Sequence, residues 1–494
     1  MKSNCFIATI AGAMVLHAGA SLALTPDQTV LYDIKLAGAT AQDNNIGALF
    51  KDLCVAGTLD EYRDGPTGSA GGSHRAYFCQ LDSSKVTGLS TSNPNVLFHK
   101  TSTTKTEGGS IGGSGIGVNP VLLKQAVDVM AINNGNCVAP VAPETYWRCR
   151  VTQPGDVTKI VPDAGVSDVD PGLFIGANTP ASVAPADKAQ VAKLLTVKSG
   201  GALVFGTPVT LELRNALQRA HIAAGTLAAD CAGLETEACM PSLAKSQIAD
   251  LFTGKVPNWT DVKIGGRNLT DFATAGTTTD SKVHLCRRTN GSGTQATINA
   301  KLLNVPCSVA AANPLETSNE LQGPVVKLNA GSGDVEKCLV DLNAGSNTSS
   351  QNSAGVKAWA IGVQSTEKNP ANSLAYRFIK IDGVAPTLEN TAAGRYGVAV
   401  ELTYQWLKNG GPTGDVAKII SRVATDAGKP SIIAKNNTAF KYTWGQGGFL
   451  AVSAEGWPVT PGGVFDPNNP VTPYTHQDPA TGALDNCRIP VIYK

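Results

Sequence analysis

Residues 287–296 read RRTNGSGTQA, a stretch in which two arginines precede an Asn-Gly turn and the expected start of a helix. The N–H groups of a first helical turn have no partners inside the helix and carry partial positive charge. The glycines let a ligand approach the backbone, Ser292 and Thr294 add hydroxyl donors, and the guanidinium of Arg288 is a planar fork suited to an oxyanion. The stretch therefore predicts a phosphate-type anion site. The alternative is an ordinary capped turn. It is not a P-loop, because no lysine follows the second glycine.

The bulk composition is that of a globular chain with no strong field of its own. The 494 residues are 42% hydrophobic and 16% charged, and the formal net charge is +1. Such a balance does not favour nucleic acid or an acidic membrane as a partner. Any anion site must therefore be local.

Helix-like and strand-like segments alternate along the chain. Apolar spacing and capping residues predict helices over 119–133, 242–254, 397–411 and 414–428. In the first of these, Asn119 is the expected N-cap and Pro120 the first helical residue. Short apolar runs at 201–211, 358–364 and 375–384 predict strands. The alternation predicts an α/β fold.

The N-terminus reads MKSNCFIATIAGAMVLHAGASLALT, with a lysine, a short apolar run and then small residues. This pattern predicts a signal peptide over residues 1–23, cut after Ala20 or Ala23. A membrane anchor is the alternative, but the apolar run is too short for it. Cys5 precedes the apolar run and is badly placed for lipid modification. We expect an exported protein without a membrane anchor.

Eleven cysteines are present, and ten remain once Cys5 is removed with the signal peptide. An even number in an exported chain predicts disulfides, up to five here. Sequence does not fix their connectivity. Pairing of neighbours suggests the bonds Cys54–Cys79, Cys137–Cys149, Cys231–Cys239 and Cys286–Cys307, with Cys338–Cys487 left over. The metal alternative lacks a Cys-x2-Cys or His-Glu-x2-His motif, so we expect no metal or other cofactor.

Three further segments, taken with residues 287–296, resemble a known family. They are IKLAGAT at 34–40, IADLFTGKVPNWTD at 248–261 and YRFIKIDGVAPTLENTAAGRYGVAVELTY at 376–404. In this order the chain resembles the phosphate-binding proteins that serve ABC transporters, which have the class II periplasmic-binding-protein fold. The resemblance implies two α/β lobes with inserted loops. Residues 24–203 and 365–494 would form the first lobe and residues 204–364 the second.

The resemblance also implies a set of phosphate ligands. Arg288, Ser292, Gly293 and Thr294 match the family's Arg-x3-Ser-Gly-Thr motif. The expected ligands of the first lobe are Thr40, Ala41, Ser114 and Asp168. Ser110 is an alternative to Ser114, because it lies one glycine-rich repeat earlier. In two places the chain departs from the family: Ala41 stands where the family has phenylalanine, and Asn290 replaces an acidic residue that supports the arginine.

The function implied is capture of inorganic phosphate in a cleft between the lobes, without covalent chemistry. We therefore expect a binding protein and not an enzyme, a monomer, located in the periplasm or secreted. Its partners would be phosphate and an ABC-transporter permease, with scavenging outside the cell as a variant.

Two other functions remain open. A secreted phosphate-ester hydrolase on the same scaffold would need a nucleophile or a metal. The Gly-x-Ser-x-Gly pattern at 108–112, with Ser110, lacks the preceding buried strand that such a nucleophile requires. An adhesion or matrix protein that lost the ligand is the other alternative, which the extra loops and cysteines favour and the intact Arg-x3-Ser-Gly-Thr run argues against. Asn-x-Ser/Thr motifs are taken as incidental, since a glycan on Asn290 would cover the predicted site, and we interpret the chain as bacterial.

Overall fold

The computed structural model describes residues 25–65, 72–106, 109–180, 183–276, 278, 280–452 and 464–492. The predicted signal peptide, residues 1–23, lies outside the described residues. Within them, no helix combines the length and the apolar character needed to cross a bilayer.

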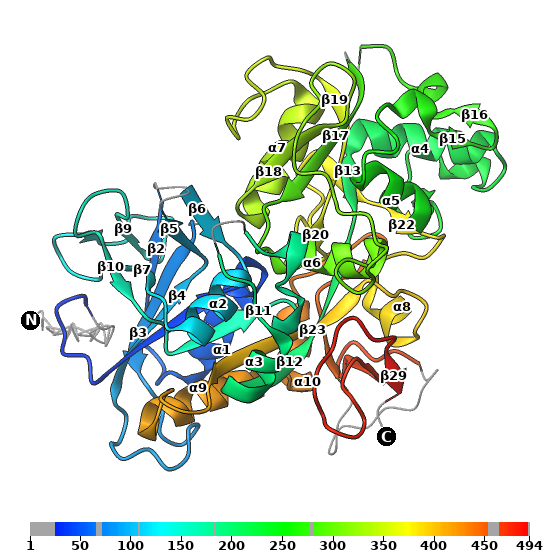
Figure 1. The fold of residues 1–494 in the computed structure, drawn as a ribbon. Helices are drawn as coiled ribbons and strands as arrows, with labels where there is room; N and C mark the ends of the chain where they lie inside the picture. The colour runs from blue at the N-terminus through cyan, green and yellow to red at the C-terminus, as the bar shows by residue number, and fades with distance from the viewer. Residues whose placement is uncertain are drawn as a thin grey trace, which may run out of the picture.

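Two sheets organise the chain into a larger and a smaller lobe, which Figure 1 shows at lower left and upper right. The larger sheet has twelve strands, with β20 (Gln364–Ser365) beside β12. Its other strands run in the order β27 (Val471–Thr472), β26 (Phe449–Val452), β12 (Leu195–Gly206), β23 (Ala399–Leu407), β11 (Ala164–Ser167), β1 (Tyr32–Gly38), β4 (Asn95–Thr101), β3 (His74–Gln80), β2 (Asp60–Asp64), β9 (Trp147–Cys149) and β8 (Cys137–Val138). The smaller sheet runs β18 (Val325–Asn329), β17 (Asp280–Arg288), β19 (Ala358–Gly362), β13 (Pro208–Thr210) and β21 (Tyr376–Phe378).

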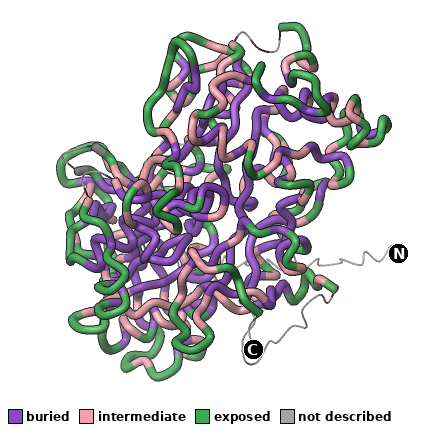
Figure 2. The backbone as a smooth tube through the Cα atoms, turned by 45° about the vertical axis from the view of Figure 1, so that its right-hand side comes forward, coloured by how far each residue is buried: buried purple, intermediate pink, exposed green. Residues whose placement is uncertain are grey.

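Helices pack on both sheets. The elements near the larger sheet are α1 (Asp43–Leu53), α2 (Gly115–Leu123), α3 (Lys188–Leu194), α9 (Gly414–Ala427) and α10 (Pro430–Asn437). The part of the chain that forms the smaller sheet also contains α4 (Leu211–Ala223), α5 (Lys245–Phe252), α6 (Gly293–Ile298) and α7 (Ser332–Ala344). Helix α8 (Leu388–Ala392) lies close to β26 and β27. The predicted α/β class is confirmed, and the buried backbone forms a continuous interior beneath exposed loops (Figure 2).

The chain crosses between the sheets at two neighbouring places. Strand β12 of the larger sheet runs directly into β13 of the smaller one, and β19 of the smaller sheet runs into β20, which pairs with β12. These crossings lie near residues 207 and 363. Strand β21 pairs with β13 in the smaller sheet, although the expected division assigns residues 365–494 to the first lobe.

The core of each lobe is built from apolar side chains of sheets and helices. In the larger lobe the rings of Phe50 on α1 and Phe98 on β4 are stacked with centroids 4.7 Å apart. In the smaller lobe Trp259 is fully buried, and its indole N–H donates to the carbonyl of Trp359 on β19 at 2.9 Å. Burial of such large rings contributes much of the stability of a domain.

Two helix predictions are wrong. Helix α2 begins after Ser114 and ends at Leu123, and Lys124 after it is in the left-handed conformation. Asn119 and Pro120 therefore lie inside the helix and not at its start. Residues Val127–Met130 form strand β7, paired with β10 (Val157–Ile160). The segment 397–411 contains β23, which lies between β12 and β11. Residues 400–406 read VELTYQW, in which apolar and polar residues alternate with the period of a strand, so the helix prediction overlooked a pattern that the sequence contains.

The other predicted segments correspond to elements of the expected type. Helix α5 falls within 242–254 and α9 within 414–428. Strands β12 and β13 overlap 201–211, β19 and β20 lie in 358–364, and 375–384 holds β21 and β22 (Lys380–Ile381).

Five disulfides are present, and three have the predicted partners: Cys54–Cys79, Cys137–Cys149 and Cys231–Cys239. The bonds predicted as Cys286–Cys307 and Cys338–Cys487 are wrong. Cys286 on β17 is bonded to Cys338 on α7, and Cys307 is bonded to Cys487 in the C-terminal arm, residues 464–492. Pairing by sequence distance fails here because α7 packs on β17 and because the arm folds back over the chain.

Candidate functional site

Arg288 is the last residue of β17 and is fully buried. Its Nε donates to the carbonyl of Asn329 at 3.2 Å, and one terminal nitrogen donates to the carbonyl of Ala330 at 2.7 Å. The other terminal nitrogen donates to Ser332 Oγ at 3.0 Å. The guanidinium is thus held at the carboxyl end of the smaller sheet, between β17 and the start of α7.

Ser292, Gly293 and Thr294 follow at the start of α6. Ser292 is the N-cap, and its hydroxyl accepts from the N–H of Gln295 at 3.3 Å. All three residues are buried. Gly291, just before them, has a φ of +91°, a conformation that glycine adopts without strain. The turn that the Asn-Gly pair predicts is therefore present before α6.

The larger lobe supplies Ser114 and Asp168. Ser114 directly precedes α2, and Asp168 follows β11. Both are buried, and the N–H of Asp168 donates to Ser114 Oγ at 2.9 Å. Their adjacency arises because α2 packs against β11.

The two sets of residues meet face to face. A β-carbon placed on Gly293 would lie 2.2 Å from Ser114 Oγ and 2.7 Å from the β-carbon of Asp168. A backbone hydrogen bond from the N–H of Gly115 to the carbonyl of Gly291, at 2.7 Å, joins the same segments. The structure therefore brings together residues that lie far apart in the sequence. We name this group, with Arg288, Ser292 and Thr294, the inter-lobe cluster.

Charges inside the cluster influence one another. Burial raises the pKa of Asp168 to about 6, and the opposing charge of Arg288 limits that rise. Burial also lowers the pKa of Arg288 to about 10, while Asp168 acts in the opposite direction. Arg288 therefore stays a cation at neutral pH, and Asp168 is poised to gain a proton in mildly acidic solution.

Three buried polar atoms at the cluster have no hydrogen-bond partner of good geometry within the described residues. They are Asp168 Oδ1, Thr294 Oγ1 and Gln42 Nε2. The amide of Gln42 lies near enough to lower the pKa of Asp168, yet Nε2 is not well aligned for a bond. Buried polar atoms are nearly always paired, so a group of unpaired ones points to a missing ligand.

Thr40 and Ala41 lie at the short helical turn η1 (Thr40–Gln42) after β1. Thr40 Oγ1 is 3.3 Å from Ser332 Oγ, the hydroxyl that accepts from Arg288. Ala41 is buried and packs in the hydrophobic core. Thr40 is therefore at the edge of the cluster, whereas the methyl side chain of Ala41 contributes to packing.

Sequence reasoning missed Gln42 and Ser332. The signal for Ser332 was available, because NAGSGD at 329–334 follows an apolar strand and precedes a helix, as RRTNGSGT does. Gln42 had no comparable signal, since its position depends on the turn η1.

The side chain of Asn290 is bonded to Arg287 and not to Arg288. Arg287 donates to Asn290 Oδ1 at 2.9 Å and is itself fully buried, with a further bond to the carbonyl of Leu315. Truncation of Arg287 is therefore expected to disturb the fold.

Ser110 is exposed on β6 (Gly109–Gly112), the second strand of a hairpin with β5 (Thr103–Thr106). A hydrolase nucleophile of the Gly-x-Ser-x-Gly type stands on a turn between a strand and a helix. Ser110 lacks that setting, so the structure offers no support for this serine as a nucleophile. In the part of the chain that is described, no group of His, Cys, Asp and Glu side chains could hold a metal.

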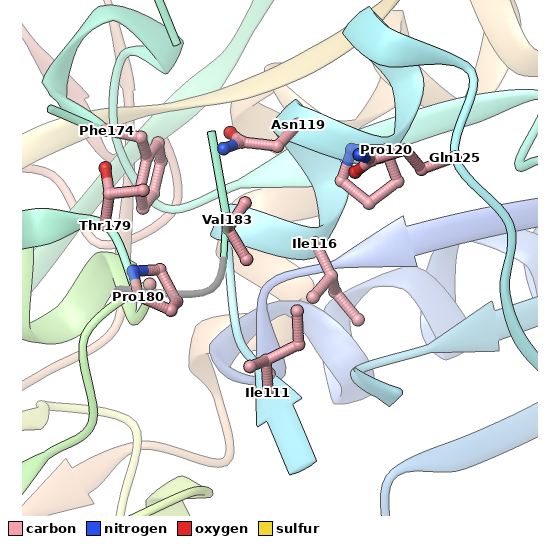
Figure 3. A pocket seen from close by; sticks show the side chains of 12 residues that line it. Ile111, Ile116, Asn119, Pro120, Gln125, Phe174, Thr179, Pro180 and Val183 are labelled. Carbon is pink, nitrogen blue, oxygen red and sulfur yellow. The ribbon is translucent and has the colours of Figure 1, made fainter. Parts of the chain in front are cut away.

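A small apolar pocket of about 20 Å³ lies on the far side of Gly115 and Gly291. Figure 3 shows the side chains around it, among them Ile111, Ile116 and Val183. Its volume is about that of one water molecule's space, so it is a packing gap beside the cluster.

Comparison with known proteins finds no matching family model and no matching curated protein. Solved structures with a related architecture do exist. One is from Clostridium perfringens, assigned as a phosphate ABC transporter substrate-binding protein and holding bound phosphate; identity is 13%, the TM-score is 0.41, and the alignment covers 82% of this chain and 97% of that one. A second is a DING protein, with 13% identity, a TM-score of 0.41 and coverage of 84% and 90%. A third is an ABC-type phosphate transport receptor from Vibrio cholerae, with 10% identity, a TM-score of 0.38 and coverage of 82% and 98%. At such identities and TM-scores the similarity says nothing about the ligand of this chain.

Proposed function

We propose that this protein binds inorganic phosphate in the inter-lobe cluster, as an exported solute-binding protein. The observation that carries the proposal is the set of unpaired buried atoms next to a buried cation. Hydrogen phosphate accepts hydrogen bonds from Gln42 Nε2 and Thr294 Oγ1, and its O–H donates a hydrogen bond to Asp168 Oδ1. Its charge faces Arg288, so each unpaired group gains a partner.

Both lobes contribute to the proposed site, which supports a closing mechanism. Asp168 and Ser114 come from the larger lobe, and Arg288 and Gly293 from the smaller one. A ligand that bridges them stabilises the closed arrangement over an open one. The proposed ligands are Thr40, Ser114, Asp168, Arg288, Ser292, Gly293 and Thr294, with Gln42 added. Ala41 remains a proposed contact through its backbone.

Delivery to an ABC-transporter permease, or scavenging outside the cell, is part of the same proposal. Five disulfides support an oxidising compartment, such as the periplasm or the medium. We propose that the protein acts as a monomer and is not an enzyme.

Isothermal titration calorimetry of the mature protein, first unfolded and refolded to remove bound ligand, tests the proposal. Phosphate and arsenate, which carry a proton near neutral pH, should bind with similar affinity and one site per chain. Sulfate should not. Failure of phosphate to bind at millimolar concentration would overturn the proposed function.

A further inference from the structure

A cleft of about 560 Å³ opens directly beside the inter-lobe cluster. The larger lobe lines it with Thr40, Asn44 and Arg75, and the smaller lobe with Ser332, Asp334 and Lys337. Its volume is in the range of pockets for small organic ligands, and far exceeds what a phosphate ion fills.

The cleft and the cluster share two hydroxyl groups. Thr40 and Ser332 line the cleft, their oxygens are 3.3 Å apart, and Ser332 also accepts from Arg288. The charge of Asp334, within the cleft, acts on Arg288 as well. One weak hydroxyl pair therefore lies between the cleft and the inter-lobe cluster, and a ligand oxygen that faces both hydroxyls from the cleft could bond to both.

Arg75 brings a guanidinium to the cleft, and Tyr77 lies near enough to raise its pKa by a side-chain hydrogen bond. Its side chain is on β3 and Arg75 is only 9% exposed, with one terminal nitrogen donating to Asn44 Oδ1 at 2.9 Å. Its Nε has no hydrogen-bond partner among the described residues. Because Nε is buried, a ligand in the cleft can contact only the remaining, exposed part of the Arg75 side chain.

The remaining side chains decide what kind of ligand fits. Asp334 and Asn44 offer acceptors, whereas Arg75 and Lys337 offer donors, so a group that both donates and accepts is favoured. Three carboxylates (Asp43, Asp334 and Glu336) and three cations (Arg75, Lys337 and Lys368) line the cleft, so it lacks the excess of positive charge that a second phosphate group favours. None of the described residues that line the cleft is aromatic, which disfavours a nucleotide base.

Building on the proposed function, we infer that the protein also takes phosphate monoesters of small polyols, with the phosphoryl group in the inter-lobe cluster and the hydroxylated part in the cleft at Arg75. The ester oxygen lies between Thr40 and Ser332. Inorganic phosphate and the ester compete for the same phosphoryl position. No bond is made or broken.

Calorimetry at about pH 6, near the second pKa of a phosphate monoester, where the phosphoryl group can still donate a hydrogen bond to Asp168, tests the inference with glycerol 3-phosphate as the probe and with inorganic phosphate, pyrophosphate and phenyl phosphate beside it. Glycerol 3-phosphate should bind at one site and should be displaced by phosphate. It should bind more tightly than pyrophosphate and phenyl phosphate. Arg75→Gln should weaken glycerol 3-phosphate about tenfold, the effect of losing one hydrogen bond to a charged group, and should leave phosphate within about twofold.

Lys337→Gln, on a half-exposed side chain, is the second variant and should weaken the ester in the same selective manner. Arg150→Gln, a matched change of an arginine outside the cleft, should alter neither ligand. If phosphate binds and glycerol 3-phosphate does not, the inference is wrong and the proposed function stands. An equal loss of both ligands in Arg75→Gln and Lys337→Gln would also overturn it. If phosphate itself does not bind, both fall together.

Discussion

Gly293 and Ser114 lie so close across the two lobes that a β-carbon on Gly293 would stand 2.2 Å from Ser114 Oγ. The second neighbour, the β-carbon of Asp168, would be 2.7 Å away. Gly293 is not at a positive φ, so alanine there brings no backbone strain. The lobes can therefore approach this closely only because Gly293 has no side chain.

Gly293→Ala should force the lobes apart or displace Ser114. Overpacking of this kind costs about 1–3 kcal/mol, so the phosphate Kd should rise about tenfold or more. Titration calorimetry measures the affinity, and small-angle scattering should show a larger radius of gyration with phosphate present. The control is Gly397→Ala, since a β-carbon on Gly397 would meet nothing within 4 Å. Unchanged affinity in Gly293→Ala would contradict the proposed closure.

Arg288→Ala removes the cation of the proposed site. Truncating one partner of a buried charge pair costs about 2–4 kcal/mol, so we expect the phosphate affinity to fall by about 30-fold to 1,000-fold. Arg288→Lys keeps the charge but loses the fork, and should recover only part of the affinity. Calorimetry of each variant gives the comparison.

The control for Arg288 must be an arginine whose loss leaves the fold intact. Arg287 is unsuitable, because it is fully buried and bonded to Asn290. Arg150, with its side chain 59% exposed, is suitable, and Arg150→Ala should bind phosphate as the wild type does. Equal affinities of Arg288→Ala and Arg150→Ala would place the site elsewhere.

The sequence was most informative where local chemistry decides the structure. The turn before Ser292 and the helix over 414–428 depend on glycine, capping residues and apolar spacing, and both could be predicted. The strand β23 was missed although residues 400–406 read VELTYQW, with apolar and polar residues alternating as in a strand; burial of Glu401, Thr403 and Gln405 between β12 and β11 is what the sequence did not indicate. The site is similar: Arg288 and Ser292 share one motif, whereas Gln42 reaches Asp168 only through the folding of the larger lobe.

The disulfide Cys307–Cys487 joins the C-terminal arm to the chain that follows α6. Lys301 strengthens the same junction, with its ammonium 2.6 Å from His476 Nε2 and 2.9 Å from the carbonyl of Asn486. Glu401 on β23 lies behind His476, whose Nδ1 is 2.6 Å from its carboxylate. The arm is thus attached both to β23 of the larger sheet and to the segment that follows α6. We expect these attachments to restrain the separation of the two lobes.

Replacing both cysteines, Cys307→Ala with Cys487→Ala, should lower the melting temperature and speed phosphate release. The bond closes a separation of 180 residues, against 8 for Cys231–Cys239. Loop-closure entropy alone then makes the former more stabilising by about 3 kcal/mol. Thermal unfolding and stopped-flow release measure the two effects. The double variant Cys231→Ala with Cys239→Ala is the control, and it should leave the release rate unchanged. Equal release rates in all three proteins would show that the arm does not restrain opening.

Asp168 should make the choice between phosphate and sulfate depend on pH. Above pH 6 the carboxyl group of Asp168 is ionised and accepts a hydrogen bond from the O–H of hydrogen phosphate. Sulfate has no O–H to donate, so the carboxylate repels it. A site built on one required hydrogen bond can reject the analogue lacking it by about 10⁴-fold. Because burial raises the pKa of Asp168 to about 6, the group gains a proton as the pH falls below that value and can then donate to sulfate. Sulfate affinity in the wild type should therefore rise as the pH is lowered from 7.5 to 5.

The variant Asp168→Asn separates this effect from other titrating groups. Asparagine can donate at every pH, so the variant should bind sulfate at pH 7.5 and show little change down to pH 5. Linkage gives a second measurement. Because the folded protein raises the pKa of Asp168, it favours the protonated form, and the stability of the ligand-free protein should fall as the pH rises from about 4 to about 6. That part of the fall should be missing in Asp168→Asn, as measured by denaturant unfolding of both proteins across the range. Equal binding of sulfate and phosphate by the wild type at pH 7.5 would remove Asp168 from the proposed site and leave a general anion site at Arg288.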